Sequence, residues 1–181
     1  MAMDYLSIIN KYYPEDNALK SILINHSRQV ADRCLLLCDR HPELRMDREF
    51  LEEAAMLHDI GIRWCHAPSI FCNGKEPYIC HGLIGADLLR KEGWERHALV
   101  CERHTGTGLT SEQIRSQQLP LPLDRIYEPL SLEEQLVCYA DKFYSKSHPE
   151  RVLTVVDTAQ SLEKFGAEGV KKFLLWAKMF E

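Results

Sequence analysis

The sequence predicts an all-helical protein, folded as one helical bundle in a single domain. Apolar residues recur at intervals of three and four along most of the chain, which is the spacing of one helix face. Residues that favour helix N-caps precede several of these stretches. No Asn-Gly or Asp-Gly turn joins two alternating β-branched runs, so no strong strand signal competes. The 181 residues are enough to bury the core of one such domain.

Capping residues and a proline mark the limits of the N-terminal helices. Pro14 cannot continue the first helix, because it lacks the backbone N–H that a helical hydrogen bond requires. Asn17 and Asp47 stand where a side-chain oxygen can accept from the free amides of a first helical turn. These signals predict three helices, over residues of about 4–12, 17–39 and 48–58.

Glycines divide the middle of the chain. Residues 61–80 are rich in Gly, Pro, Cys and aromatic residues, so we expect a structured loop there. A helix that begins at His81 is broken at Gly93, and the next helix ends before the glycine-rich segment 105–108. Two helices are therefore predicted, over residues of about 81–92 and 94–104.

The C-terminal part contains a clear helix start. Ser131 followed by Glu134 has the sequence of a capping box, in which two side chains satisfy free amides of the first turn. We expect a short helix from Thr110, a proline-containing loop over 119–130, and helices over about 131–146, 150–165 and 167–180. The whole chain, residues 1–181, is expected to form one domain with its core at about 17–148 and the last two helices packed on it.

Composition and charge limit the possible partners. Apolar residues make up 45% of the chain and charged residues 27%, which excludes a largely disordered protein. The net charge of −5 gives no electrostatic reason to bind a nucleic-acid duplex. No apolar run approaches the length needed to span a bilayer, and the first residues lack the pattern of a signal peptide. We therefore expect a cytoplasmic protein with no membrane or duplex partner, and a homodimer remains open.

The cysteines do not form a recognisable framework. There are seven, none of them in a Cys-x-x-Cys pair, so disulfides are not expected. Cys65, His66, Cys72, Cys80 and His81 follow one another closely, but their spacing matches no zinc-finger or zinc-ribbon pattern. We interpret most of these thiols as small buried hydrophobic groups.

Six ionisable residues fall on or beside the apolar stripes of the predicted helices. A single histidine on such a stripe is most often a hydrogen-bonded core residue. The carboxylates are harder to explain, because an unpaired aspartate inside a bundle costs several kcal/mol or takes up a proton. Asp141 has no basic residue on its own stripe, so a cation is the expected partner. The six residues are His26, His58, Asp59, His81, His104 and Asp141.

The adjacent pair His58-Asp59 needs a helix end. Neighbouring side chains on a regular helix point about 100° apart, so both reach one centre only where the helix stops. Gly61 makes such an end plausible. The two oxygens of Asp59 could then bridge a pair of metal ions, and the imidazole and carboxylate set suits manganese, iron or zinc.

These residues match a family signature. His26 and the segments Leu57–Gly61 (LHDIG) and Ala140–Lys142 (ADK) resemble the H…HD…D pattern of HD-domain metal-dependent phosphohydrolases. His81 and His104 resemble the added ligands of the subset that binds two metal ions, which includes the HD-domain symmetrical diadenosine tetraphosphate hydrolases. The HD-GYP cyclic-dinucleotide phosphodiesterases are less similar, because their lysine directly after the glycine and their Gly-Tyr-Pro element are absent from this sequence.

The resemblance implies a helical bundle of the HD-domain type with two divalent metal ions. Its first ion would be held by four residues and its second by three, with Asp59 bridging. Iron or manganese is expected first, and zinc, nickel, cobalt or magnesium are further possibilities. The implied ligands are His26, His58, Asp59 and Asp141 for the first ion, and Asp59, His81 and His104 for the second.

The resemblance also implies hydrolysis of a phosphate ester or anhydride of a nucleotide-type substrate by a metal-bridged hydroxide. Symmetrical diadenosine tetraphosphate is the best substrate hypothesis. Arg63 and Lys142 are predicted to contact the substrate phosphate, although solvent-exposed surface residues are an equal interpretation. Phe71, Tyr78 and Tyr127 could stack on a base, but loop aromatics more often pack the loop onto the domain.

Two other functions remain open at this stage. The same fold could act as a nucleoside 5'-monophosphatase or as a phosphatase of another small metabolite. A non-catalytic helical module with a structural metal is the alternative from a different class, and closed coordination would favour it.

Overall fold

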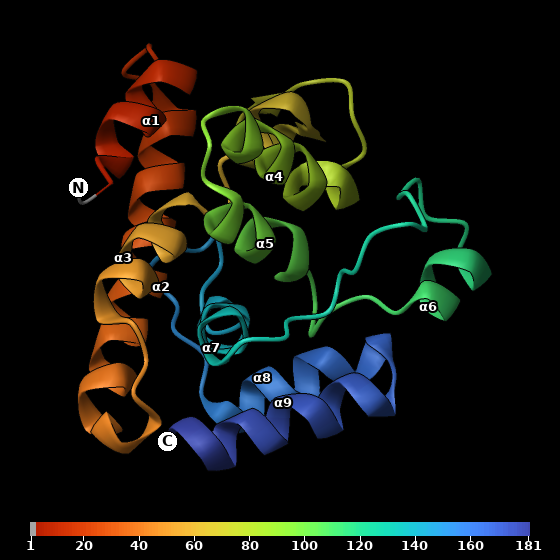
Figure 1. Cartoon of the computed structure of the whole chain (residues 1–181). Helices are drawn as coiled ribbons and strands as arrows, with labels where there is room; N and C mark the ends of the chain where they lie inside the picture. The colour runs from red at the N-terminus through yellow and green to blue at the C-terminus, as the bar shows by residue number, and fades with distance from the viewer. Residues whose placement is uncertain (1–2) are drawn as a thin grey trace.

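The computed structural model describes residues 3–181, and these residues form nine α-helices with one very small sheet (Figure 1). The predicted all-helical fold class is confirmed. The first two residues, at the start of the predicted N-terminal region, lie outside the described residues. No helix within residues 3–181 combines the length and the hydropathy needed to cross a bilayer.

The N-terminal helices begin and end close to their predicted limits. They are α1 (Tyr5–Tyr12), α2 (Ala18–Arg40) and α3 (Arg48–Leu57). The predicted caps form, because the side chain of Asn17 accepts from the amide of Lys20 at 3.0 Å and that of Asp47 from Phe50 at 3.1 Å. Since α3 ends at Leu57, the His-Asp pair lies in the turn that follows the helix.

The middle of the chain holds α4 (His81–Lys91) and α5 (Glu95–Arg103), separated at Gly93 by a backbone with φ of +83°. The loop before α4 contains two strands that the sequence did not predict, β1 (His66–Ala67) and β2 (Cys72–Asn73). They pair antiparallel, with His66 opposite Asn73. Strands of two residues are too short to show the alternation that marks a strand in a sequence.

The predicted long helix ends early. The short α6 (Ser111–Ser116) precedes α7 (Leu132–Asp141), which stops five residues before the predicted limit at Lys146. The chain leaves the helix because the amide of Leu153 donates to the carbonyl of Phe143 at 2.9 Å, which ties the segment after α7 into an extended pairing. The predicted capping box is also half correct: Ser131 accepts from the amide of Glu134, but the carboxylate of Glu134 accepts from Leu130 instead.

The C-terminal pair of helices packs beneath α7 (Figure 1). The first, α8 (Val155–Leu162), begins later than predicted, because Thr154 and Asp157 form a capping box at that point. The second is α9 (Ala167–Phe180), and its Phe173 ring lies 5.0 Å from the ring of Tyr139 on α7.

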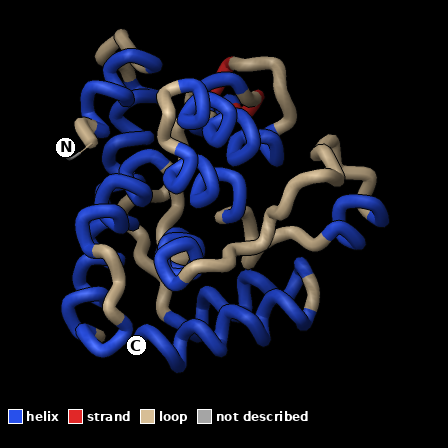
Figure 2. Tube along the Cα trace, in the orientation of Figure 1, coloured by secondary structure: helices blue, strands red, loops and turns tan. Residues whose placement is uncertain are grey.

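Helix α7 is the centre of the bundle and contacts α2, α3, α5 and α9. Its residues 136–140 are buried throughout. Figure 2 shows that long loops carry α6 away from the other helices, whereas the helices around α7 are close together. Elements far apart in the sequence therefore meet where α7 ends. All seven cysteines are buried and free in the structure.

Candidate metal centre

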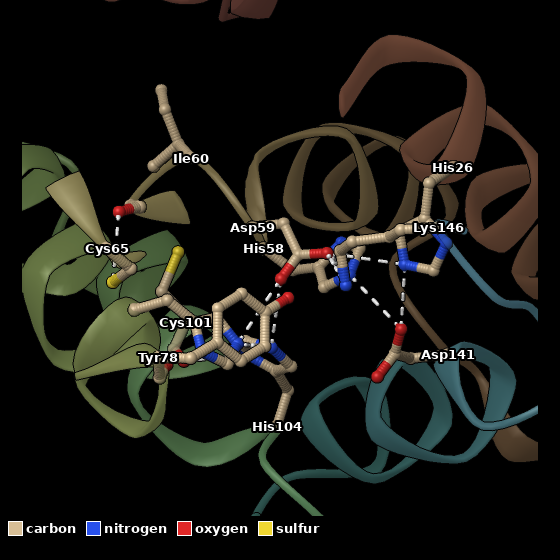
Figure 3. A network of polar contacts seen from close by, with 12 residues as sticks. His26, His58, Asp59, Ile60, Cys65, Tyr78, Cys101, His104, Asp141 and Lys146 are labelled. Carbon is tan, nitrogen blue, oxygen red and sulfur yellow. Dashed lines mark hydrogen bonds and ion pairs between the residues drawn. The ribbon is translucent and has the colours of Figure 1, made fainter. Parts of the chain in front are cut away.

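The structure brings the six predicted side chains together. Figure 3 labels five of them, all except His81. Their ligand atoms form two groups, and within each group these atoms lie within 4.8 Å of one another. We call His26, His58, Asp59 and Asp141 the first group, and Asp59, His81 and His104 the second group. The two groups share only Asp59, and all six residues together are called the metal centre.

Most of these residues are presented by helix ends. His81 begins α4, His104 follows directly after α5, and Asp141 is the last residue of α7. The pair His58-Asp59 lies just after α3, and of the six residues only His26 lies in the interior of a helix. Helix ends suit this role because neighbouring residues there can point to one place, which a regular helix prevents.

Two glycines allow the helices to approach closely enough. A Cβ on Gly61 would lie 2.1 Å from the carbonyl oxygen of His81, so any larger residue would push the turn after Asp59 away from α4. A Cβ on Gly82 would lie 2.5 Å from the carbonyl oxygen of Cys101 on α5. Both distances are too short for a side chain, so these glycines set the positions of the histidines on α4 and α5.

In the first group, two imidazoles face two carboxylates. Nε2 of His26 lies 2.9 Å from Oδ1 of Asp141 and 3.3 Å from Oδ2 of Asp59. Nε2 of His58 lies 3.4 Å and 3.1 Å from the same two oxygens. These four residues therefore surround one point with two nitrogens and two oxygens.

In the second group, the other oxygen of Asp59 takes part. Its Oδ1 lies 3.4 Å from Nε2 of His81 and 3.3 Å from Nε2 of His104. The two imidazole nitrogens lie 3.0 Å from each other. Each oxygen of Asp59 thus faces one group, as expected for a carboxylate that bridges two cations.

Backbone carbonyls fix the tautomer of three of the histidines. Nδ1 of His58 donates to the carbonyl of Ala55, and Nδ1 of His81 donates to that of Tyr78, both at 2.6 Å. Nδ1 of His104 donates in the same way to the carbonyl three residues earlier, at 2.7 Å. Because a carbonyl only accepts, each Nδ1 carries a proton and Nε2 of each ring faces the centre, which is the usual orientation of metal-ligating histidine.

Several buried polar atoms of the metal centre lack the hydrogen-bond partners that buried polar atoms usually have. Within residues 3–181, neither oxygen of the wholly buried Asp59 accepts a hydrogen bond of standard geometry, although the ammonium of Lys146 lies 2.6 Å from Oδ2, and Nε2 of His58 has no hydrogen-bond partner. Burial lowers the pKa of His81 to about 3, with His104 acting in the same direction. A buried carboxylate with imidazole nitrogens facing both of its oxygens fits a divalent cation in each group.

The comparisons with known proteins agree with this geometry. The family model for the HD domain matches residues 23–145, which is more than half of the chain.

The chain belongs to the HD-domain family.

Within this HD domain, the two groups that share Asp59 form a candidate metal site with ligands for two ions.

Three proteins are similar to this chain, and the match covers only part of each protein. An uncharacterized protein of Methanocaldococcus jannaschii is 35% identical over 125 residues, which are 64% of this chain and 66% of that one. A tRNA (cytidine(56)-2'-O)-methyltransferase of Picrophilus torridus is 30% identical over 165 residues, 86% of this chain and 42% of that one. The protein of the same name from Thermoplasma volcanium is 30% identical over 153 residues, 84% and 39%. The chain thus spans two thirds or less of the length of these relatives, and no solved structure matches it.

Of the two cationic residues predicted to contact phosphate, one lies against the metal centre. Nζ of Lys142 lies 2.5 Å from Oδ2 of Asp141 and donates to the carbonyl of His104 at 3.1 Å. Arg63 instead donates to the carbonyl of Tyr12 at 2.7 Å and lies over the ring of Tyr13. Its observed contacts therefore belong to the N-terminal segment, and a role in phosphate binding stays a prediction.

Sequence reasoning missed a second lysine. Nζ of Lys146 lies 2.6 Å from Oδ2 of Asp59, in the segment that follows α7. The one available signal was its position four residues after Lys142, which places both on one face of a continuous helix. Tyr78, which the sequence left as one of three possible base-stacking residues, stacks on the ring of His81 at 4.6 Å.

Proposed function

We propose that this HD-domain protein hydrolyses a phosphate ester or anhydride bond of a small nucleotide-type molecule with two bound divalent metal ions. The observation that carries the proposal is that the two oxygens of Asp59 face two separate groups of imidazole ligands. The ligands would be His26, His58, Asp59 and Asp141 for one ion, and Asp59, His81 and His104 for the other.

Two such ions would supply a water of lowered pKa and would neutralise charge on phosphoryl oxygens. The residues of the chain would hold and orient them. The Nδ1 hydrogen bonds keep three imidazole rings in one orientation, and Asp59 is shared between the groups. Lys142 holds Asp141 in place and uses two of its three N–H groups on Asp141 and His104. The third N–H remains for a phosphoryl oxygen, which is the contact predicted from the sequence.

A cavity beside the centre would receive the organic part of the substrate. Its volume is about 350 Å³, and its lining includes Ile79, Leu109, Leu119, Phe165 and the side chain of Lys142. This apolar lining suits a nucleobase or another flat apolar group. Lys142 joins the cavity to the centre, because the same side chain also contacts Asp141.

The first substrate to test is symmetrical diadenosine tetraphosphate, on the strength of the sequence resemblance. A nucleoside 5'-monophosphate or a similar small phosphate ester is the second candidate. The position of Lys142 favours this second candidate, since a group in the cavity would lie directly beside the scissile phosphate rather than a chain of phosphates away. A purely structural metal is less well supported, because the family is one of hydrolases and the centre adjoins a cavity.

The proposal includes no other partner. The methyltransferase name of two relatives is not carried over, because the chain matches only 42% and 39% of their length. A net charge of −5 gives no basis for duplex binding. Iron and manganese are the metals to try first, followed by zinc, nickel, cobalt and magnesium.

An activity panel tests the proposal. Protein loaded with manganese or with iron is incubated with diadenosine tetraphosphate, nucleoside 5'-monophosphates, guanosine tetraphosphate and bis(p-nitrophenyl) phosphate. We expect turnover of at least one nucleotide, and loss of that turnover after chelation. Metal-loaded protein that cleaves none of these compounds would contradict the proposal.

A further inference from the structure

Lys146 is a nearly buried lysine that ends on the carboxylate shared by the two groups. Its side chain is only 15% exposed, and Nζ lies 2.6 Å from Oδ2 of Asp59. The ammonium also lies 6.0 Å from the centroid of the Tyr78 ring. Figure 3 shows the side chain reaching the Asp59 carboxylate from the segment that follows α7.

This lysine neutralises Asp59. Its ammonium and the carboxylate of Asp59 lie at ion-pair distance, and the lysine side chain is largely buried beside the wholly buried acid. A buried lysine that keeps its charge needs such a partner, because desolvation otherwise favours the neutral amine. Asp59 needs the partner equally, since its oxygens accept no hydrogen bond.

A divalent ion in the first group and the ammonium of Lys146 would compete for the same oxygen. Oδ2 of Asp59 is the oxygen that faces His26 and His58, at 3.3 Å and 3.1 Å. Two positive charges on one oxygen repel strongly where water is excluded. Lysine carries its charge on a long flexible stem, so it can move away while the imidazoles stay in place.

The direction in which the Lys146 side chain can move is indicated by the solvent exposure of the residues around the centre. Asp141 and Lys142 are each 12% exposed and Lys146 is 15% exposed, whereas the side chains of the other five ligands are at most 7% exposed. A phosphate can therefore approach the centre on the side of the two lysines. An ammonium there would form charge-assisted hydrogen bonds with phosphoryl oxygens.

We infer that Lys146 is a built-in counter-ion that changes partner: it neutralises Asp59 in the metal-free protein, and in the metal-loaded protein its ammonium binds the phosphoryl oxygens of the substrate. The inference rests on the proposed function for its substrate class. It adds a phosphate-binding residue and an order of events, in which a cation takes over Asp59 before Lys146 becomes available to the substrate.

Titration of chelator-treated protein with Mn²⁺ tests whether Lys146 and a metal ion compete for Asp59. Lys146→Met should bind Mn²⁺ about tenfold more tightly than the wild type, because a competing cation is gone. Lys146→Arg keeps the charge and should bind as the wild type does. Lys20→Met is the matched control, since Lys20 is 12% exposed and its ion-pair partner is the exposed Asp16. Unchanged Mn²⁺ affinity in Lys146→Met would overturn the exchange of partners.

Thermal unfolding gives a second test of the competition between Lys146 and a metal ion for Asp59. Lys146→Met should melt at a lower temperature than the wild type without metal, and the difference should shrink when Mn²⁺ is saturating. A variant that folds only with Mn²⁺ would be the extreme form of this result. An equal loss with and without Mn²⁺, repeated in Lys146→Gln, would show that the lysine is merely structural.

Binding of inorganic phosphate to the Mn²⁺-loaded protein tests the second half. We expect Lys146→Met to bind phosphate about tenfold more weakly, because a charge-assisted hydrogen bond is lost. Lys146→Arg should retain most of the affinity, and equal phosphate affinity in wild type and Lys146→Met would overturn this half. These measurements need no turnover, so their failure is distinguishable from that of the proposed function, which fails if no substrate is cleaved.

Discussion

Glu102 and Asp59 are both carboxylates in the interior, but their surroundings differ completely. Glu102, which is 4% exposed, accepts hydrogen bonds at both oxygens from Arg90, at 3.0 Å and 2.8 Å. Arg125 donates a further hydrogen bond at 2.9 Å. Asp59 is 0% exposed and accepts no hydrogen bond at either oxygen.

The difference teaches that burial alone does not mark a functional acid. Burial opposes ionisation in both residues, yet the pKa of each lies below its ordinary value, through Arg90 and Arg125 for Glu102 and through His58 and Lys146 for Asp59. Arg90 and Arg125 satisfy the hydrogen bonds of Glu102 and neutralise its charge. Asp59 has one ammonium partner, Lys146, and its remaining neighbours are imidazole nitrogens, which are the groups that bind metal ions.

Neutralising Asp59 and Glu102 in separate variants should give the largest difference in metal content and activity. We expect Asp59→Asn to lose both metal ions and to lower activity by about a thousandfold or more, because both groups depend on this residue. Glu102→Gln removes the same charge at similar burial and should keep two ions and near wild-type activity. Metal content and turnover of the two purified variants check this. Equal metal content in both variants would remove the distinction between the two acids.

Two histidines, His97 on α5 and His104 directly after it, sharpen the comparison. His104→Gln should lower the metal content from two ions to one and reduce activity by about a hundredfold, because the second group loses one of its two imidazoles. His97→Gln is the matched control: His97 is also buried, but its Nε2 bonds to Glu53 at 2.9 Å, outside the centre. One ion per chain in the wild type, together with full activity of His104→Gln, would exclude a dinuclear mechanism.

The sequence predicts the six residues of the centre because their positions follow helical periodicity. Asp141 was conspicuous since its stripe carries no basic residue, and the end of α3 at the His-Asp pair was expected from Gly61. The cations were harder to place. Arg63 lies in an irregular segment, where periodicity gives no direction for a side chain.

Lys146 was missed for a different reason. The predicted helix continued to this residue, whereas the chain leaves α7 at Asp141 and is held by the pairing of Phe143 with Leu153. A contact between residues 59 and 146 depends on that tertiary pairing, which no local pattern reports. The two-residue strands were missed because they are too short to show alternation, whereas the start of α8 was marked by the local capping pair Thr154 and Asp157.

The stability of Glu102→Gln should show the other side of the comparison. We expect the free energy of unfolding to fall by about 2 kcal/mol, since hydrogen bonds from two arginines to a buried charge are weakened and both arginines remain partly exposed to solvent. Urea unfolding of chelated protein measures this. A loss of activity larger than the loss of folded protein would instead place Glu102 in the function of the centre.

The smallest expected effect is a pH dependence that belongs to Glu102 alone. Its pKa in the folded protein is below the ordinary value of 4.5, with burial opposing and Arg90 and Arg125 lowering it. The unfolded chain therefore binds the proton more readily, and the stabilisation is fully present above pH 4.5 and is lost as the pH falls through the folded pKa. Urea unfolding between about pH 5 and pH 3 should show a shallower decline for Glu102→Gln than for wild type. Identical slopes would mean that the arginines give Glu102 no net preference for the charged form, and that its difference from Asp59 lies in geometry and not in charge.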